Sequence, residues 1–516
     1  MTNRKSVFIL ICFLIHISLM YSNNIQVSNV RLTGQNTTDN FTMVEFDITW
    51  ENSWRVVGGP GNWDAAWIFV KYRIGAGEWK HAWLNNTGHT FCAGTTIAAG
   101  LLTPSSPFHP TTNPCLGVFL YRADPGSGIF NCTNVQLQWN YAENGLSDNE
   151  QVDIKVFAIE HVYVPEGSFK VGSGGAETGA FYSYPYITNP FEITSEGAIT
   201  VAASAGNLYY QSSGDQMGPI PALFPKGYND FYMMKYEISQ QGYVDFLNTL
   251  TRPQQSFRIE TDISSPPITN VFVMSETTSP ESRNGIWSRT TIPPVPSPII
   301  LFCNLNNNTS PNEINDGQNL ACNGLSWGDF TAYLDWAGLR PMTEFEFEKC
   351  SRGPIDPVPN EFCWGDNYVQ PGYGLYNDGY PNEVLIDTFA NLITANGGVV
   401  RCGILARPTT NRTFSGATYY GAMDFAGNVW ELGVTIGTSF GRSFAGHHGD
   451  GLLNPAGQND VATWPEASSG PSLRGGSFIE SYTYLDPTIS GRRFGSYAMT
   501  TRQFHIGGRG CRIAPN

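Results

Sequence analysis

The stretch that decides the fold is GLSWGDFTAYLDWAGLRPMTEFEFEKCSRG, residues 324–353. Its first half predicts a helix over 326–337, because apolar side chains recur there at the spacing of one helix face. These side chains are Trp327, Phe330, Tyr333 and Leu334. Gly338 follows directly and is a typical helix stop. A tight turn is therefore expected after the first helix.

The second half predicts a short helix over 343–350. Thr343 and Glu346 have the spacing of a capping box, in which each side chain bonds the backbone of the other residue. Arg340 precedes this helix, and we expect it to pair locally with its acidic residues and so fix the turn. Those acidic residues are Glu344, Glu346 and Glu348.

One more helix is predicted upstream, over 239–250, with Ser239 as its N-cap. The rest of the region that begins near 161–165 mixes short strand-like segments with Gly-rich irregular backbone, for example 441–471. Ordered loops of that length usually depend on metal ions or disulfides.

Residues 24–158 have the alternating pattern of an all-β domain. Apolar residues occupy every second position in three runs: Val44, Phe46, Ile48 and Trp50; Val135, Leu137, Trp139 and Tyr141; Val152, Ile154, Val156 and Ala158. Such runs predict strands with one buried face, and several of them predict a β-sandwich over 23–158. Seven tryptophans lie here and are interpreted as core; an aromatic platform for a sugar or a protein partner is the alternative.

Six blocks of the chain resemble, in order, the formylglycine-generating enzyme (sulfatase-modifying factor) family. They are VYVPEGSFKVGS at 162–173, FYMMKYEISQQGYVDFLN at 231–248, the stretch 324–353, FCWGD at 362–366, YGAMDFAGNVWEL at 420–432 and LRGGSF at 473–478, and the chain closes with GGRGCRIA. The resemblance implies a C-type-lectin-like fold for 159–516. The predicted fold class is therefore α+β: an all-β sandwich followed by a formylglycine-generating-enzyme-like domain rich in irregular loops.

The resemblance also implies which chemistry to look for. Active family members bind copper through two cysteines shortly after the RGGS motif, and thiolates suit Cu(I) because both are soft. Here 474–494 reads RGGSFIESYTYLDPTISGRRF, and no cysteine occurs between Cys402 and Cys511. One cysteine cannot supply the pair, and no three-His helical domain of the iron-dependent relatives is visible. We therefore expect no copper, no iron and no catalytic residue.

A structural Ca²⁺ ion is expected from the same resemblance. The matching ligand positions are Asp424 and Glu431, with the backbone carbonyls of Gly427 and Val429. Carboxylates and carbonyls are the hard oxygen donors that Ca²⁺ needs. The alternative is that Asp424 caps a turn and Glu431 is solvated. A second family site would use Asn391, but its acidic partner cannot be placed.

The family's substrate face corresponds to the segment after the RGGS motif. Its candidate ligand-binding residues are Glu480, Tyr482, Tyr484, Arg492, Arg493 and Arg502, with His505 nearby. Hypervariable receptor proteins of diversity-generating retroelements display their ligand-binding residues on the same face of this fold. Aromatic and arginine side chains suit a recognition surface; they equally suit a packed end of the domain.

Composition limits the partners. Charged residues make up 14% of the 516 residues, and the net charge is −15. Without excess cation a nucleic-acid partner is not expected, and a hydrophobic share of 41% excludes a disordered chain. Residues 1–22 have the basic start and short apolar run of a signal peptide, so a secreted, extracellular or cell-surface protein without a transmembrane segment is expected.

Nine cysteines follow the signal peptide, and export would favour disulfides. Spacing suggests Cys303 with Cys322 and Cys350 with Cys363. One further pair is expected among Cys92, Cys115 and Cys132. Sequence alone does not establish connectivity, and an odd number leaves one thiol over.

Three functions are compatible with these features. The first is a secreted, non-catalytic surface or extracellular-matrix protein that acts in adhesion or self-assembly, including fibre formation, through a lectin-like pseudo-enzyme domain. Its partner would be itself, as a homo-oligomer or polymer, or another surface protein or glycan. The second is a formylglycine-generating or sulfoxide-forming oxidoreductase. The third is a ligand-binding receptor of the retroelement type. We favour the first because the cysteine pair is missing and low charge permits association.

Overall fold

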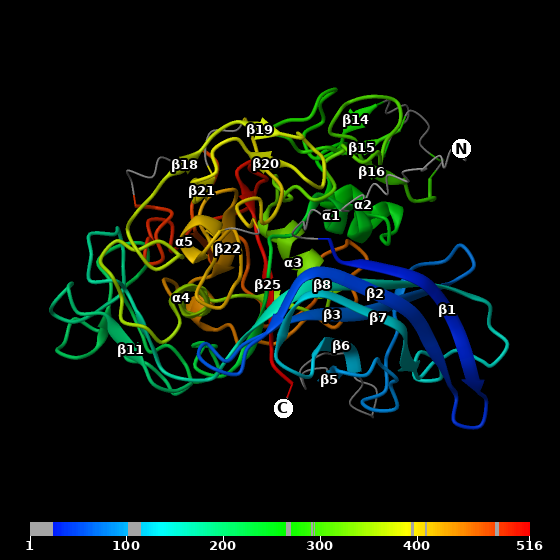
Figure 1. The fold of residues 1–516 in the computed structure, drawn as a ribbon, viewed down its shortest axis with the longest axis horizontal. Coiled ribbons are helices and arrows are strands. Elements are labelled where there is room, and N and C mark those ends of the chain that lie inside the picture. Colours follow the sequence, from blue (N-terminus) through cyan, green and yellow to red (C-terminus); the bar gives the residue numbers. More distant parts are fainter. Residues whose placement is uncertain are drawn as a thin grey trace, which may run out of the picture.

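The computed structural model describes residues 24–101, 115–264, 270–289, 293, 295–393, 397–407, 410–479 and 485–515. The predicted signal peptide, 1–22, lies outside these residues. The described part is mostly β, with several sheets and a few short helices (Figure 1). Within it no helix has both the length and the apolar character needed to span a bilayer.

Long strands dominate the first part of the chain. They are β1 Gln26–Asn36, β2 Phe41–Arg55, β3 Asp64–Ile74, β4 Lys80–His81, β5 Thr95–Leu101, β6 Cys115–Arg122, β7 Gly126–Trp139 and β8 Val152–Val164. The three alternating runs of the sequence lie in β2, β7 and β8, except Tyr141, which follows β7, so these strands are confirmed.

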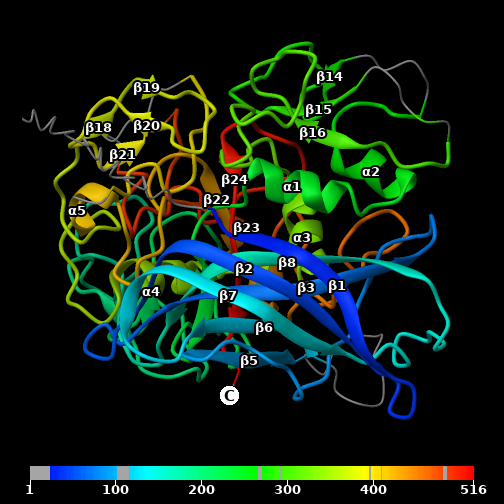
Figure 2. The same cartoon turned by 45° about the vertical axis from the view of Figure 1, so that its right-hand side comes forward.

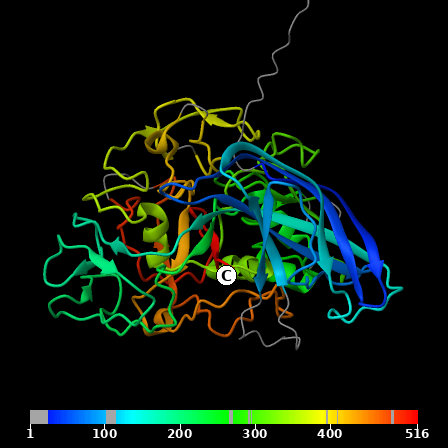
Figure 3. The ribbon, with the colours of Figure 1, turned by 60° about the horizontal axis from the view of Figure 1, so that its bottom comes forward.

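Strands after β8 are short. They are β9 Phe169–Val171, β10 Tyr182–Ser183, β11 Phe191–Ile193, β12 Leu208–Tyr209, β13 Phe231–Met234, β14 Val271–Phe272, β15 Ile286–Ser288, β16 Leu301–Cys303, β17 Arg340–Pro341, β18 Pro371–Gly372, β19 Leu375–Tyr376, β20 Val384–Leu385, β21 Leu392–Ile393, β22 Trp430–Val434, β23 Pro471–Arg474, β24 Ile506–Gly507 and β25 Gly510–Ile513. Irregular backbone connects them, as the glycine content predicts. In Figure 3 the blue-green loops that follow β8 lie at the left, opposite the blue strands of β1 and β2.

One eight-stranded sheet joins the two halves of the chain. Its order is β17-β25-β13-β8-β3-β6-β5, with β4 added beside β3. β8 pairs antiparallel with β3 along its length, and its last residues, 161–164, also pair with β13. The domain boundary predicted at 158/159 therefore falls inside β8, and the sheet continues across it.

A second sheet, β1-β2-β7, covers one face of the first part of this sheet (Figure 2). Alternate residues of β3 face it: Ala66, Ile68, Val70 and Tyr72 share a core with Val44, Phe46, Leu137 and Trp139. The intervening residues of β3 face the C-terminal region, where Trp67 donates a hydrogen bond from Nε1 to the Ala337 carbonyl at 2.8 Å. Both faces of β3 are buried, so the sandwich and the C-terminal region share one packed interior.

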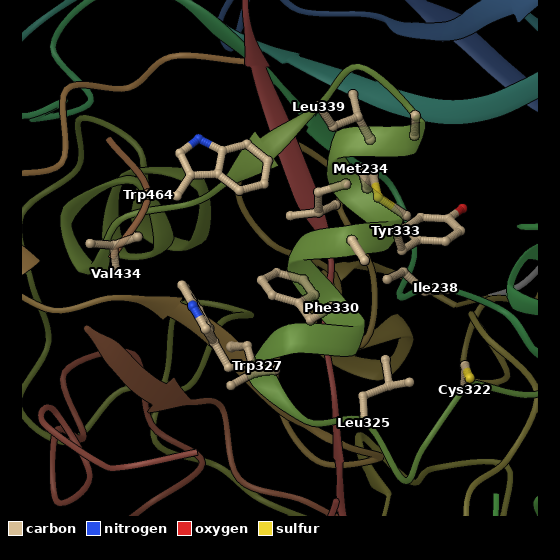
Figure 4. Packing of buried hydrophobic residues seen from close by; sticks show 14 of the residues in the cluster. Met234, Ile238, Cys322, Leu325, Trp327, Phe330, Tyr333, Leu339, Val434 and Trp464 are labelled. Atoms are coloured by element: carbon tan, nitrogen blue, oxygen red, sulfur yellow. The ribbon is translucent and has the colours of Figure 1, made fainter. Parts of the chain in front are cut away.

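The three predicted helices are present. They are α1 Gln240–Leu247, α3 Trp327–Trp336 and α4 Glu344–Arg352, with N-caps at Ser239, Ser326 and Thr343, and α4 has the predicted capping box. The apolar side chains of α3 point into the main core, as Trp327, Phe330 and Tyr333 show in Figure 4. Three further helices are α2 Arg252–Arg258, α5 Arg412–Ser415 and α6 Ser439–Arg442.

Most tryptophans are core residues, as predicted. Trp50, Trp67 and Trp139 are at most 1% exposed. The four tryptophans of the C-terminal region that flank glycines, Trp327, Trp336, Trp364 and Trp430, are all buried.

The structure forms one disulfide, between Cys92 and Cys132, within the trio in which one pair was expected. The other two predicted pairs are not formed. Cys303, Cys322, Cys350 and Cys363 are free, buried thiols. Each of these four thiols lies in an apolar cluster, where it packs as a small hydrophobic group.

Candidate functional site

The centre of the C-terminal region is a buried ionic network on α4. The acidic positions of the sequence EFEFE point inward, and each meets an arginine. Arg340 pairs with Glu346 at 2.5 Å, which confirms the predicted local pairing, and both side chains are at most 2% exposed. The other two α4 glutamates pair with arginines distant in sequence, and Glu348 also pairs with Arg352 of the same helix at 3.2 Å.

Arg474 and Arg492 come from the segment after β22, and both reach Glu344. The Arg492–Glu344 distance is 2.8 Å and the Arg474–Glu348 distance is 2.9 Å, with every side chain fully buried. Arg492 also lies over the rings of Phe181 and Tyr210. Ionic groups at this depth are stable only when fully paired, so these residues hold the core together.

The predicted calcium segment runs from Asp424 into β22. Glu431 is buried, and its two oxygens accept hydrogen bonds from Arg509 at 2.8 and 2.5 Å. Burial raises the pKa of Glu431, and Arg509 opposes that rise. Glu431 is therefore neither solvated nor free to bind a cation, because a guanidinium already occupies both oxygens.

Asp424 is different. It is 2% exposed; its Oδ2 accepts a hydrogen bond from the Gly403 amide at 2.5 Å, while its Oδ1 is buried without a hydrogen-bond partner. Burial raises the pKa of Asp424 to about 6. Glu237 lies near it, and burial followed by repulsion from Asp424 raises the pKa of Glu237 well above its usual range.

Glu237, which the sequence did not predict, and the predicted ligand Asn391 are also engaged. Glu237 accepts hydrogen bonds from the amide group of Asn428 at 2.7 Å and from the backbone N–H of Val429 at 3.3 Å. Asn391 is buried, and its side-chain oxygen accepts a bond from the Gln370 amide at 2.7 Å. Gly427 lies against the Ile393 backbone, so the two predicted calcium segments are neighbours.

This arrangement does not fit the predicted calcium site. Ca²⁺ binds roughly six to eight oxygen donors. Among the predicted side-chain donors, only Asp424 keeps an oxygen atom without a hydrogen-bond partner. Arg509 supplies the positive charge that the ion would bring. Sequence reasoning missed Glu237 and Arg509, although both lie in the family-like blocks 231–248 and 506–514.

A second acidic group lies between the two halves of the chain. Among the described residues, Asp335, Asp450 and Asp460 bring carboxylate oxygens within 4.8 Å of one another. Lys71 of β3 is buried beside them and donates to the Gly451 carbonyl at 2.5 Å. Burial lowers the pKa of Lys71 to about 7, while Asp335 and Asp450 oppose that shift. Lys71 is therefore a basic group of the chain whose charged form the cluster favours.

The free thiols lack the properties of metal ligands or nucleophiles. All seven free cysteines in the described part of the chain are buried. Burial raises the pKa of Cys115 to about 11 and that of Cys350 and Cys363 to about 12, and it raises the pKa of Cys402 and Cys511 well above the usual range. Since the thiolate is the reactive form, these groups stay protonated and inert at neutral pH.

The predicted ligand-binding face is only partly described. Glu480, Tyr482 and Tyr484 lie outside the described residues. Arg492 belongs to the buried network, so it does not lie on an exposed face. Arg493 is half-exposed and pairs with Asp486 at 3.3 Å.

Arg502 pairs with Asp329 at 2.8 Å and with Glu260 at 3.0 Å, and its side chain is 16% exposed. The nearby His505 accepts a hydrogen bond from the Trp430 amide at its carbonyl, at 2.9 Å. Arg502 and His505 therefore help to pack the end of the chain.

Comparison with known proteins assigns the family. A family model described as the sulfatase-modifying factor enzyme 1-like domain matches residues 155–501, about two thirds of the chain. The chain belongs to the sulfatase-modifying factor enzyme 1-like family. The buried thiols and paired carboxylates described above are thus features of a member of this family, and the resemblance inferred from the six sequence blocks is confirmed.

Two curated family members are similar over short segments. The formylglycine-generating enzyme of Streptomyces coelicolor is 32% identical over 107 residues, which cover 21% of this chain and 29% of that enzyme. The formylglycine-generating enzyme of Thermomonospora curvata is 29% identical over 120 residues, which cover 21% of this chain and 30% of that enzyme. The chain thus matches under a third of either relative's length.

One solved structure aligns with a larger share of the chain, but with lower sequence identity. Treponema denticola variable protein 1 has a TM-score of 0.28 and 10% identity, and the superposition covers 69% of this chain and 96% of that protein.

Proposed function

We propose that this sulfatase-modifying factor family member is a secreted, non-catalytic surface or extracellular-matrix protein that acts in adhesion or self-assembly. The observation that carries the proposal is the state of its thiols. The family's copper chemistry needs two cysteines after the RGGS motif, and this chain has none between Cys402 and Cys511. Both of these flanking thiols are buried, with raised pKa values.

Surface composition supports a role in contact. Large aromatic side chains are exposed around β18–β21: Tyr368 49%, Tyr373 52%, Tyr376 60% and Phe389 64%. Aromatic residues are enriched at the centres of protein interfaces, and a clustered exposed apolar surface indicates an interaction site. A surface with few charges also lowers the repulsion between copies.

Export is the other part of the proposal. It rests on the basic-then-apolar pattern of residues 1–22 and on the Cys92–Cys132 disulfide, a bond that is rare in reducing compartments. Negative-stain electron microscopy of the secreted, purified protein tests the assembly function. Filaments, sheets or defined oligomers are expected, whereas dispersed single particles at all concentrations would contradict it.

A second candidate is an oxidoreductase of the formylglycine type, which the family membership favours. It requires a redox metal, and a copper-dependent member would bind Cu(I) tightly through thiolates. Titration of the protein with Cu(I) against a colorimetric chelator measures this. Retention of one copper per chain in competition with the chelator would support the enzyme; loss of all copper to the chelator would support the contact function.

A further inference from the structure

A large cleft lies where the sandwich meets the helices of the C-terminal region. Its volume is about 950 Å³, and it is lined by the turn after β3, by the α1–α2 junction and by residues 296–300. Exposed apolar residues form its rim: Pro253, Pro296, Pro298, Ile300 and Pro455. Ile300 alone is 65% exposed. A volume of this size suits several residues of a bound chain, not a single ion.

Two cations lie at one end of this cleft. Arg73 and Lys155 both contact the ring of Trp79, at 4.7 and 4.8 Å from its centre. Arg73 pairs with Asp153 at 2.8 Å. Among the described residues no carboxylate lies at ion-pair distance from Lys155; burial lowers its pKa, and the charge of Asp245 on α1 opposes that shift. A partly buried ammonium that has no carboxylate in direct contact can form an ion pair with an incoming carboxylate.

The chemistry of the walls points to a protein segment. The amide groups of Asn248 and Gln254 line the cleft, but they are already bonded to backbone groups of residues 251, 301 and 454. These two amide groups are therefore not free to bind sugar hydroxyls. The exposed prolines and Ile300 gain most from apolar side chains. The matching occupant is a carboxylate with large apolar side chains on both sides.

The chain itself carries such segments on its surface. In the described residues a carboxylate lies between two exposed large apolar side chains at three places: 355–358, 376–380 and 386–389. In the first, Asp356 already pairs with Lys170 at 2.6 Å; in the second, Asp378 pairs with Arg283.

The third segment is Ile386-Asp387-Thr388-Phe389. Ile386 is 51% exposed and Phe389 is 64% exposed. Asp387 accepts bonds from the Phe389 amide and from Gln370, but it has no ion pair with a described residue, so its carboxylate can accept more.

We propose that the cleft binds segment 386–389 of a second copy of the chain, with Asp387 facing Lys155 and Phe389 packed on the proline rim. The proposal rests on the proposed function in self-assembly and specifies the two surfaces that would form the contact between copies. The segment follows β20, at the upper left of Figure 2, whereas the cleft borders α2, at the upper right. The cleft of one copy contacts a different surface, segment 386–389, on the next copy. Such a contact is head-to-tail, and its repetition produces rings or filaments.

Charge reversal tests this contact in the full mature chain. Sedimentation velocity over a wide concentration range measures association of wild type, Lys155→Glu, Asp387→Lys and the double variant. Each single reversal places like charges together and should raise the dissociation constant for self-association about tenfold or more. The double variant restores opposite charges and should return to within about threefold of wild type.

Matched controls use the excluded segment. Lys170→Glu and Asp356→Lys make the same changes on a surface pair, and both should associate like wild type. Thermal midpoints and circular dichroism confirm that each variant is folded, and recovery in the double variant rules out misfolding as the cause of a loss.

The failures are distinguishable. If wild type associates and the single reversals associate equally well, or the double variant does not recover, the cleft contact is wrong and self-assembly stands. If wild type remains monomeric at every concentration, both the cleft contact and self-assembly are wrong.

Discussion

Replacing Asp424 by Asn should make the protein less sensitive to pH. Burial raises the pKa of Asp424 from 3.8 to about 6, and each unit is worth about 1.4 kcal/mol. Because the folded pKa lies above the unfolded one, this group stabilises the fold below about pH 4, and that stability is lost as pH rises through about 6. The wild type therefore loses about 3 kcal/mol from Asp424 between pH 4 and pH 8, and the Asn variant does not.

Asn suits the site because Asp424 has a φ of 63°, a conformation that Asn tolerates. The measurement is the change in thermal midpoint on substitution, at pH 4 and at pH 8. For a chain of this length 3 kcal/mol corresponds to about 3 °C. The Asn variant should gain about 3 °C relative to wild type between the two pH values.

Asp39→Asn, at an exposed position, is the matched control for this substitution and should show no gain. Chelation with EDTA should leave the wild-type midpoint unchanged, since Arg509 already neutralises Glu431. If Asp424→Asn instead lowers the midpoint at pH 8, and EDTA lowers it reversibly in wild type, then Asp424 binds calcium and the reasoning is refuted.

Other perturbations have equally definite outcomes. Glu344→Gln leaves the buried Arg492 without a carboxylate partner, while Arg474 keeps Glu348, and the change should cost about 3–5 kcal/mol. Thermal unfolding measures the cost, with exposed Glu192→Gln as the neutral control; an equal midpoint for the two variants would contradict the network. Reducing Cys92–Cys132, whose residues are 40 positions apart, should cost about 4 kcal/mol, and an unchanged midpoint in reductant would show that the bond does not constrain the unfolded chain. The buried thiols should react with a thiol reagent only after unfolding; fast labelling of a native cysteine, located by mass spectrometry, would refute their inert state.

Local patterns predicted the local structure well. The caps of α1, α3 and α4 were readable because each uses a Ser or Thr side chain within three residues of the helix start. The same signal was present for α2, where Thr251 and Gln254 form a capping box. It was missed because the helix is short and its apolar spacing is weak. Alternation likewise identified β2, β7 and β8.

Long-range contacts were not readable from the sequence. The boundary predicted at 158/159 followed the end of the alternating strand pattern and the start of the family-like blocks, but β8 pairs with β3 on one edge and with β13 on the other. Glu431 matched a calcium ligand by position, yet Arg509, 78 residues later, occupies it. Pairing between distant charges depends on topology, and one sequence does not reveal it. The lectin-like fold and secretion stay predictions.

The most direct test of the account is an assay for the family's chemistry. The purified chain, supplied with Cu(I), oxygen and a cysteine-containing sulfatase peptide, should leave the peptide thiol intact, because its own thiols are buried and protonated and no cysteine pair follows the RGGS motif. Mass spectrometry of the peptide reports the outcome. Conversion of the cysteine to an aldehyde, abolished by Cys511→Ser or Cys402→Ser, would contradict the non-catalytic function.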